Sequence, residues 1–245
     1  MRNARYIPAG LLLTASAMLL TACGIGSDGA GSRISGVPLA ELDRSGPPPS
    51  AIRLGGSDRV IVVTGSPFDI RVSGDQEAVD ALRFTLKNNA LGIGRMPGTS
   101  RGQALIRVTT PETHALVLGG SGDLEADRLT GDARITIGGS GSVKVSDIDA
   151  ENLAVTIGGS GTLLGSGRTR MLDIKVGGSG DAQLAGLEAD QANVSVGGSG
   201  DVAFASDGAV SVSVAGSGDV TVDGEARCSV SKAGSGTVTC GRMTY

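Results

Sequence analysis

Apolar and polar residues alternate strictly in short segments throughout the second half of the chain. In one segment, for example, Leu172, Ile174 and Val176 are apolar, whereas Asp173 and Lys175 between them are charged. Successive side chains of an extended strand point to opposite faces, so this alternation is typical of a strand with one buried and one exposed face. The pattern recurs about every twenty residues, which predicts a series of similar strands.

Short glycine-rich motifs separate the alternating segments. Each reads Gly-Gly-Ser-Gly or, in the last two copies, Ala-Gly-Ser-Gly, and its serines are 18 to 20 residues apart. Such a period is typical of a solenoid. We therefore predict an all-β fold, a single-stranded parallel β-helix of about seven coils stacked about 4.8 Å apart. We expect the glycines at the corners, where they permit positive φ angles and let successive corners nest. The serines are Ser121, Ser140, Ser160, Ser179, Ser199, Ser217 and Ser235.

Residues 51–115, which precede the repeats, have shorter and less regular apolar segments. β-Branched runs separated by glycine, proline and asparagine indicate strands and turns, and one segment has apolar residues at helical spacing. We therefore expect a strand-rich N-terminal part ahead of the β-helix. Its predicted elements are strands at 60–63, 68–72 and 104–109, a helix at 76–82 with Asp75 as its N-cap, and a hairpin at 84–93.

The first 22 residues have the features of a bacterial export signal. Two arginines precede an apolar stretch at 11–20, which is too short to span a membrane. The stretch ends in Leu-Thr-Ala-Cys-Gly, which resembles the lipobox of bacterial lipoproteins. The resemblance implies that residues 1–22 are a lipoprotein signal peptide, that Cys23 is lipidated and that Gly24 directs the protein to the outer membrane. The alternative is an ordinary signal peptide with an incidental cysteine.

The rest of the chain divides into a tether and a repeat region. Residues 23–50 are rich in glycine, serine and proline, and we expect them to form a lipidated tether that spans about 30 Å as a coil. Residues 116–245 comprise the repeats and a C-terminal cap.

Two cysteines fall at inward positions of the last coil, Cys228 and Cys240, twelve residues apart. In an oxidising compartment we predict a disulfide between them, which would contribute about 2–3 kcal/mol. A metal or redox role is the alternative, but the spacing is not Cys-x-x-Cys. Lys232 lies at the same end, and we expect this coil to cap the exposed edge of the β-helix.

The opening strands read DRVIVVTGSPFDIRVSGDQEAVDALRF at residues 58–84, and Gly-Ser-Gly-Asp recurs in four of the later coils. Over about residues 51–241 this layout resembles the putative auto-transporter adhesin, head GIN domain family. The resemblance implies a single-stranded β-helix on a bacterial envelope protein, and it brings no catalytic residues. Three coils depart from the pattern, with Ser142, Thr162 and Thr237 in place of aspartate.

Composition excludes several classes of function. The chain has 41 glycines, two tyrosines, three phenylalanines, no tryptophan and a net charge of −4. Nucleic-acid binding is excluded, because no basic block matches a phosphate backbone and few aromatic residues exist for bases to stack on. The single histidine, His114, is expected to be structural because no second histidine accompanies it. We predict no catalytic residues, no metal centre and no enzymatic activity.

Aspartate follows the glycine-rich motif in three consecutive coils, at Asp181, Asp201 and Asp219. Their carboxylates would lie about 5 Å apart in a column, and like charges at that distance favour a bound cation. We therefore hypothesise a cation site there for Ca²⁺, which prefers carboxylate and carbonyl oxygens. The alternative is that the carboxylates are solvated and accept hydrogen bonds from the turn backbone. No cofactor is expected beyond the lipid on Cys23 and this Ca²⁺.

Together these features predict a non-enzymatic lipoprotein of the cell envelope, anchored in the outer membrane and facing either the periplasm or the cell surface. Its outward rows of serine, threonine and asparagine would contact a glycan or another envelope protein in adhesion. The alternative is a structural or scaffolding module that faces the periplasm and binds another envelope protein. A polysaccharide-active β-helix enzyme is a third hypothesis, which the regular spacing of the acidic residues disfavours. The expected partners are the membrane, through the lipid, and an envelope protein or glycan.

Overall fold

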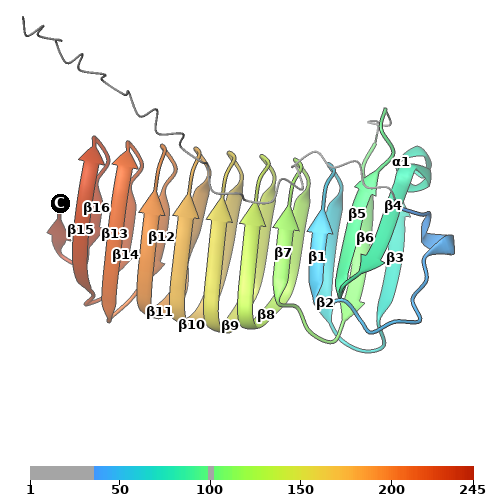
Figure 1. Ribbon diagram of the computed structural model, residues 1–245, viewed down its shortest axis with the longest axis horizontal. Helices are drawn as coiled ribbons and strands as arrows, with labels where there is room; N and C mark the ends of the chain where they lie inside the picture. Colours follow the sequence, from blue (N-terminus) through green and yellow to red (C-terminus); the bar gives the residue numbers. More distant parts are fainter. Residues whose placement is uncertain (1–35, 99–101) are drawn as a thin grey trace, which may run out of the picture.

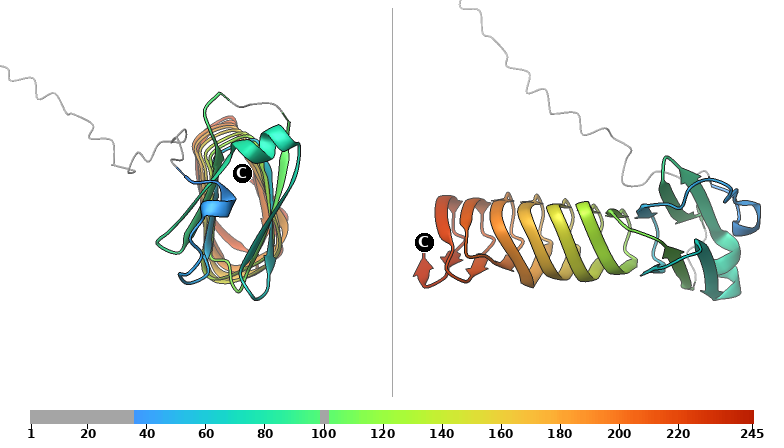
Figure 2. Two further views of the ribbon diagram at one scale, coloured as in Figure 1. Left: turned by 90° about the vertical axis from the view of Figure 1, so that its right-hand side faces the viewer. Right: turned by 90° about the horizontal axis from the view of Figure 1, so that it is seen from below.

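The computed structural model describes residues 36–98 and 102–245. They form one 17-stranded sheet wound into a flattened rod (Figure 1). Seen along its axis, the rod has two broad faces joined by two narrow edges (Figure 2). The predicted parallel β-helix of about seven coils is confirmed.

Four long strands make up the regular middle of the rod: β8 (Asp123–Ile137), β9 (Ser142–Ile157), β10 (Thr162–Val176) and β11 (Asp181–Val196). Each pairs in parallel with the next over nearly its whole length. Each strand runs along one broad face, bends round the lower edge and returns along the other face (Figure 1). Burial alternates along β11 as the polar and apolar pattern predicts.

Toward the C-terminal end, each coil is made of two short strands instead of one long strand. β12 (Val202–Ala205) and β13 (Ala209–Gly216) are followed by β14 (Val220–Asp223), β15 (Arg227–Gly234) and β16 (Val238–Cys240). The spacing of the motif serines falls from 20 to 18 residues here. The chain therefore rounds the lower edge in a tighter turn, which interrupts the strand. All five strands continue the parallel ladders.

The interior of the rod is a stack of aliphatic ladders. Ile137 lies beside Ile157, and Ile157 lies beside Val176, so like side chains stack from coil to coil. Burying each such side chain contributes about 1.5–3 kcal/mol relative to leaving it exposed. Only two aromatic residues, Phe84 and Phe204, are in the buried core of the described residues. The core is thin enough to be filled by valine, isoleucine and leucine.

The glycine-rich corners confirm one expectation and correct another. Among the described motif glycines, only Gly216 (φ 153°) and Gly234 (φ 139°) have positive φ, so that prediction is wrong for the first five corners. The close nesting is confirmed, because a Cβ atom on Gly139 would lie 1.8 Å from the carbonyl oxygen of Gly120. The motif requires glycine because the backbone of each coil passes directly over that of the previous coil.

Two coils at the N-terminal end come from parts of the chain that are not consecutive. β1 (Ala51–Leu54) lies between β7 (Ala115–Leu118) and β5 (Ala90–Arg95), in parallel with both. β2 (Arg59–Thr64) lies in the same way between β8 and β6 (Ala104–Thr110). The chain forms the β1–β2 coil first, adds the β5–β6 coil outside it, and then crosses back to β7 (Figure 1). Coil stacking thus extends into residues 51–110.

Antiparallel strands and one helix cover the outer side of the β5–β6 coil. β3 (Asp69–Gly74) pairs with β6, β4 (Leu82–Lys87) pairs with β5, and α1 (Gln76–Ala81) connects β3 to β4. These elements confirm the predicted strands, helix and hairpin. Asp75 is the N-cap residue of α1, as predicted, although its side chain makes no capping bond. Its carboxylate instead accepts the backbone N–H of Gln103 at 3.1 Å.

Two short elements complete the described fold. A 3₁₀ helix, η1 (Leu39–Glu41), precedes β1, and β17 (Met243–Thr244) pairs antiparallel with β16 at the opposite end of the rod. In residues 36–98 and 102–245, no helix has the length and apolar character needed to cross a membrane.

Candidate functional site

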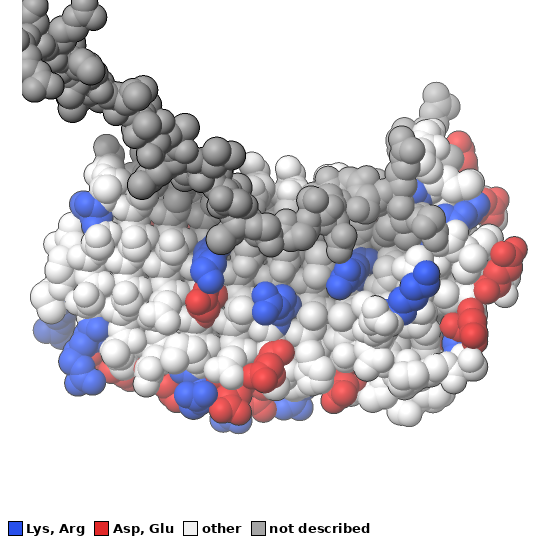
Figure 3. Space-filling model, viewed as in Figure 1, with Lys and Arg blue, Asp and Glu red and all other residues white. Residues whose placement is uncertain are grey.

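The outward side chains of residues 193–195 in β11, 211–213 in β13 and 229–231 in β15 form what we call the uncharged face. Its side chains stand in register from coil to coil, so each column repeats at about the 4.8 Å spacing of neighbouring strands. Figure 3 shows that charged side chains gather along the lower edge of the rod and are sparse on this broad face. None of its six hydroxyl and amide side chains forms a hydrogen bond with another described residue, and all six are exposed: Asn193, Ser195, Ser211, Ser213, Ser229 and Ser231.

A shallow hollow of about 230 Å³ lies on the same face, where β10, β11, β13 and β15 meet the lower edge. Met171 supplies an apolar contact, Gln191 and Asn193 supply amides, and Arg227 supplies a guanidinium. Arg227 is exposed and makes no ion pair with another described residue. The hollow therefore offers hydrogen-bond donors and acceptors together with one positive charge.

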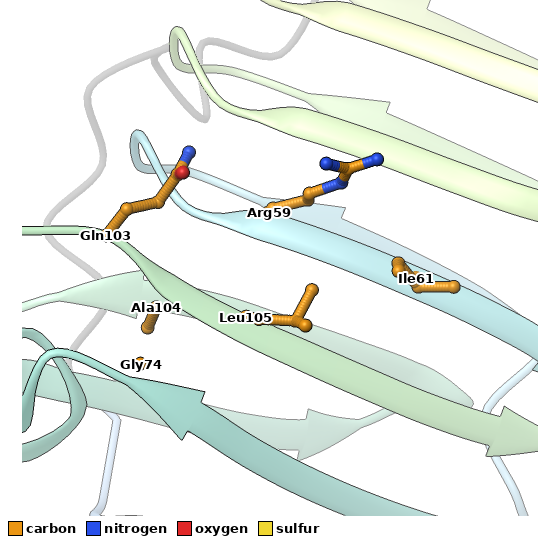
Figure 4. A pocket seen from close by; sticks show the side chains of 6 residues that line it. All are labelled: Arg59, Ile61, Gly74, Gln103, Ala104 and Leu105. Carbon is orange, nitrogen blue, oxygen red and sulfur yellow. The ribbon is translucent and has the colours of Figure 1, made fainter.

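A second hollow, of about 410 Å³, lies on the opposite broad face near the N-terminal end. Figure 4 shows Arg59 and Ile61 on one strand and Leu105 on its neighbour. Ile61 and Leu105 are half-buried, so they form an apolar floor. The Arg59 guanidinium lies 2.5 Å from the Glu125 carboxylate, which partly neutralises the rim.

The three aspartates predicted to bind a cation do stand in one column. Asp181 accepts the backbone N–H of Asp201 at 3.1 Å, Asp201 accepts that of Asp219 at 2.9 Å, and Asp219 accepts that of Thr237 at 2.7 Å. Each carboxylate thus accepts a hydrogen bond from the turn backbone of the next coil, which agrees with the alternative interpretation. The described residues contain no group of three or more His, Cys, Asp or Glu placed to hold a metal ion. Cation binding stays a prediction.

Charged residues along the lower edge pair with one another between coils. Arg128 of β8 lies 3.4 Å from Asp147 and 3.1 Å from Asp149, both in β9. Arg168 of β10 lies 3.1 Å from the same Asp149. The Arg168 guanidinium, and then that of Arg128, holds the pKa of Asp149 below its usual value. The edge is balanced in charge, so it offers little net attraction to a charged partner.

Sequence reasoning missed a buried ion pair between the two non-consecutive coils. Asp58 is fully buried and the Arg95 side chain is 7% exposed. Arg95 Nε donates to Asp58 Oδ2 at 2.8 Å, a second guanidinium nitrogen binds Oδ1, and the Ala104 N–H donates to Oδ1 at 2.8 Å. The hydrogen bonds to Asp58 raise the pKa of Arg95. The signal was an eighth copy of the glycine-rich motif, which reads Gly-Gly-Ser at residues 55–57 with Asp58 in place of the final glycine.

The predicted disulfide is confirmed. Cys228 and Cys240 join β15 to β16 across the interior, with a Cα–Cα distance of 6.4 Å. His114 is half-buried, and its Nδ1 lies 2.7 Å from the carbonyl oxygen of Thr130, as a structural histidine would. Cys23, the signal peptide and the first part of the tether lie outside the described residues.

A model of the family described as "Putative auto-transporter adhesin, head GIN domain" matches residues 48–226 of the chain. No curated protein matches it.

Several solved structures are similar in fold, among them these three. A "putative adhesin" from Bacteroides fragilis is 21% identical, with a TM-score of 0.69, covering 78% of this chain and 92% of that one. A "putative lipid binding protein" from Parabacteroides distasonis is 18% identical, with a TM-score of 0.58, covering 79% and 92%. A "putative adhesin" from Parabacteroides merdae is 17% identical, with a TM-score of 0.55, covering 78% and 91%. At these identities the likeness shows the fold alone.

Proposed function

Because this chain belongs to the putative auto-transporter adhesin, head GIN domain family, we propose that it is a non-enzymatic protein of the bacterial cell envelope. In this proposal the solenoid is a rigid surface for adhesion, and the uncharged face is the part that makes contact.

The regular array on the uncharged face is the observation that carries this proposal. Its hydroxyl and amide groups repeat at the spacing of the coils, which suits a repetitive polar polymer better than a compact ligand. Arg227 adds one positive charge at the rim of the hollow. The best match is an envelope glycan that carries hydroxyl, amide and carboxylate groups, such as peptidoglycan.

Membrane attachment is the second part of the proposal. Cys23 carries the lipid, and residues 23–50 tether the rod to the outer membrane. The lipobox-like residues 20–24 support this, and two or more acyl chains anchor a protein stably where one chain does not.

The contact face is tested by cosedimentation of the full-length protein with purified peptidoglycan. Ser213→Glu places a carboxylate in the middle of the uncharged face, and Gln183→Glu places one at an exposed position of the same strand layer on the opposite face. We expect Ser213→Glu to reduce binding about tenfold through charge repulsion and Gln183→Glu to leave it unchanged. Equal effects of the two variants, or no binding by the wild type, contradict the proposal. Release of sugars from any polysaccharide contradicts its non-enzymatic part.

The alternative is a scaffolding module that faces the periplasm and binds another envelope protein. Protease digestion of the full-length protein on intact cells, compared with cells whose outer membrane has been permeabilised, shows which side of the membrane the rod faces. Digestion on intact cells supports adhesion at the surface and contradicts contact with peptidoglycan, which lies inside the outer membrane. Protection until the membrane is opened fits both the scaffold and contact with peptidoglycan, and the cosedimentation of wild type and Ser213→Glu then separates these two.

A second candidate function, binding of an amphiphile, is favoured by the apolar floor of the hollow between β2 and β6. One relative in fold is described as a putative lipid-binding protein. If this function holds, the full-length protein binds a fluorescent fatty acid, Leu105→Asp weakens that binding, and Ser213→Glu does not. Absence of uptake by the wild type contradicts it.

A further inference from the structure

Strand β15 is an open edge of the sheet. Within the described residues it pairs with β13 and with no strand on its other side. Arg227 N–H donates to Gly208 at 2.8 Å and Ser235 N–H donates to Gly216 at 3.0 Å. Backbone groups of alternate residues point to opposite neighbours in a parallel sheet, so Ser229 and Ser231 also face β13. The N–H and C=O groups of the residues between them therefore face the open side: Cys228, Val230 and Lys232.

The other strands of the two end coils are paired on both sides. At the same end β17 pairs antiparallel with β16. At the opposite end β3 and β4 pair with β6 and β5. A second copy that added its N-terminal end to β15 would meet antiparallel strands that already cap that end. Continuation of the parallel coils from one copy into the next is thus blocked.

The last inward position of β15 carries a charge, whereas the same position is apolar in every earlier repeat. Val230 is half-buried and continues the ladder of Val212, but Lys232 occupies the place that Val214 has in the coil before. Lys232 is exposed, and its Nζ donates to the backbone oxygen of Tyr245 at 3.0 Å. Two copies joined end to end would enclose two such lysines, which is unfavourable. A strand that carries a carboxylate beside Lys232 would gain an ion pair instead.

We propose that β15 binds one extended strand of another protein in parallel, as β13 pairs with β11 and with β15. The bound strand places an apolar side chain over Val230 and an aspartate or glutamate, two residues later, over Lys232. Backbone pairing provides affinity in such strand addition, and the alternate side chains provide specificity. This inference goes beyond adhesion and does not depend on the uncharged face.

The test uses the full chain and two labelled peptides in fluorescence anisotropy. The peptide AVSVSEAG copies residues 209–216 with glutamate at the place of Val214, and AVSVSKAG has lysine there. We expect the glutamate peptide to bind about tenfold more tightly than the lysine peptide. Lys232→Glu is expected to reverse this preference, and Lys144→Glu, at an exposed position of β9, to leave it unchanged.

A third variant tests the backbone pairing. Val230→Pro removes an N–H that faces the open side and no bond to β13, so both peptides should lose binding while the melting temperature changes little. If Val230→Pro does not fold, the Lys232→Glu reversal still decides the outcome. The proposal is overturned if neither peptide binds at millimolar concentration, if the two bind equally, or if Lys232→Glu leaves the preference unchanged. Sedimentation that shows a dimer displaced by the peptide also overturns it, because the edge then serves a second copy.

Discussion

The two ends of the rod meet the same structural need in different ways. Each end coil has a neighbour on one side only, so its backbone groups and interior lack partners. At the N-terminal end, β3 and β4 pair with both strands of the end coil and α1 connects them. At the C-terminal end, β17 pairs with β16 alone, and the Cys228–Cys240 disulfide links β15 to β16.

The difference shows that an end coil either has its strand edges paired or keeps one of them free to bind another strand. A cap made of additional chain pairs with both strands of the end coil, and a buried ion pair joins that coil to its neighbour. A covalent link needs few residues and leaves one edge unpaired. The N-terminal end is therefore built for stability, and the C-terminal end keeps a surface that another strand can use.

The largest expected effect concerns the N-terminal end. Asp58→Ala leaves the Arg95 guanidinium buried without its carboxylate, and we expect it to reduce the free energy of unfolding by about 3–5 kcal/mol. Asp173→Ala, which removes an exposed partner of Lys175 in a middle coil, is the control and should change stability little. Urea-induced unfolding measures both. If Asp58→Ala changes stability as little as Asp173→Ala does, the N-terminal end does not depend on the buried ion pair.

A steric change compares the C-terminal end with the middle of the rod. A Cβ on Gly139 would lie 1.8 Å from Gly120 O, and one on Gly236 would lie 2.1 Å from Gly218 O. We expect Gly139→Ala to cost about 3 kcal/mol and Gly236→Ala to cost less, because the last coil has one neighbour and is able to shift. Gly158→Ala, with no atom within 4 Å of its Cβ, is the control. Thermal unfolding measures the loss of stability in each of the three variants. Equal losses for Gly139→Ala and Gly236→Ala would contradict this prediction.

Removal of the disulfide tests the covalent closure directly. We expect the double variant Cys228→Ala, Cys240→Ala to lose about 2–3 kcal/mol, with faster hydrogen exchange confined to β15 and β16. A reductant should lower the melting temperature of the wild type and leave that of the double variant unchanged. Loss of protection that extends to β1 or β2 would show that the two ends are coupled.

The aspartate column should matter less than either end. Asp201→Ala removes one accepted hydrogen bond from the Asp219 N–H, and we expect it to cost about 1 kcal/mol. Asp201→Asn should cost less, because an amide oxygen still accepts the bond. If the column binds Ca²⁺, millimolar Ca²⁺ raises the melting temperature of the wild type and not of Asp201→Ala. No shift in the wild type would contradict the cation hypothesis.

The smallest effect is expected at the lower edge, away from both ends. Arg168, and then Arg128, lowers the pKa of Asp149 from its usual 3.8. A carboxyl whose pKa is lowered by folding stabilises the protein above its unfolded pKa, and this contribution is lost as pH falls through the folded pKa. The melting temperature should therefore fall below about pH 4, and Asp149→Asn should show a smaller fall. Added salt should reduce this difference between wild type and Asp149→Asn. Identical pH profiles for the two proteins would contradict the prediction.

The coils were predictable because each one carries its own complete signal. Leu172, Ile174 and Val176 alternate with polar residues within a single strand, and a glycine-rich motif follows at once. The disulfide was predictable for the same reason, since both cysteines occupy inward positions of one coil. The positive φ angles were wrongly expected at the first corners, because close backbone approach is itself sufficient to require glycine there.

The sequence by itself determined the coil, its inward and outward faces and the nesting of its corners, because alternation and period are local properties of consecutive residues. Only the tertiary structure decided the order of the N-terminal coils, the pairing of Asp58 with Arg95 and the open side of β15. These features depend on which distant segment becomes a neighbour, as when β1 takes β5 on one side and β7 on the other. Such neighbours are chosen by burial and backbone pairing across the whole molecule, which no local period records.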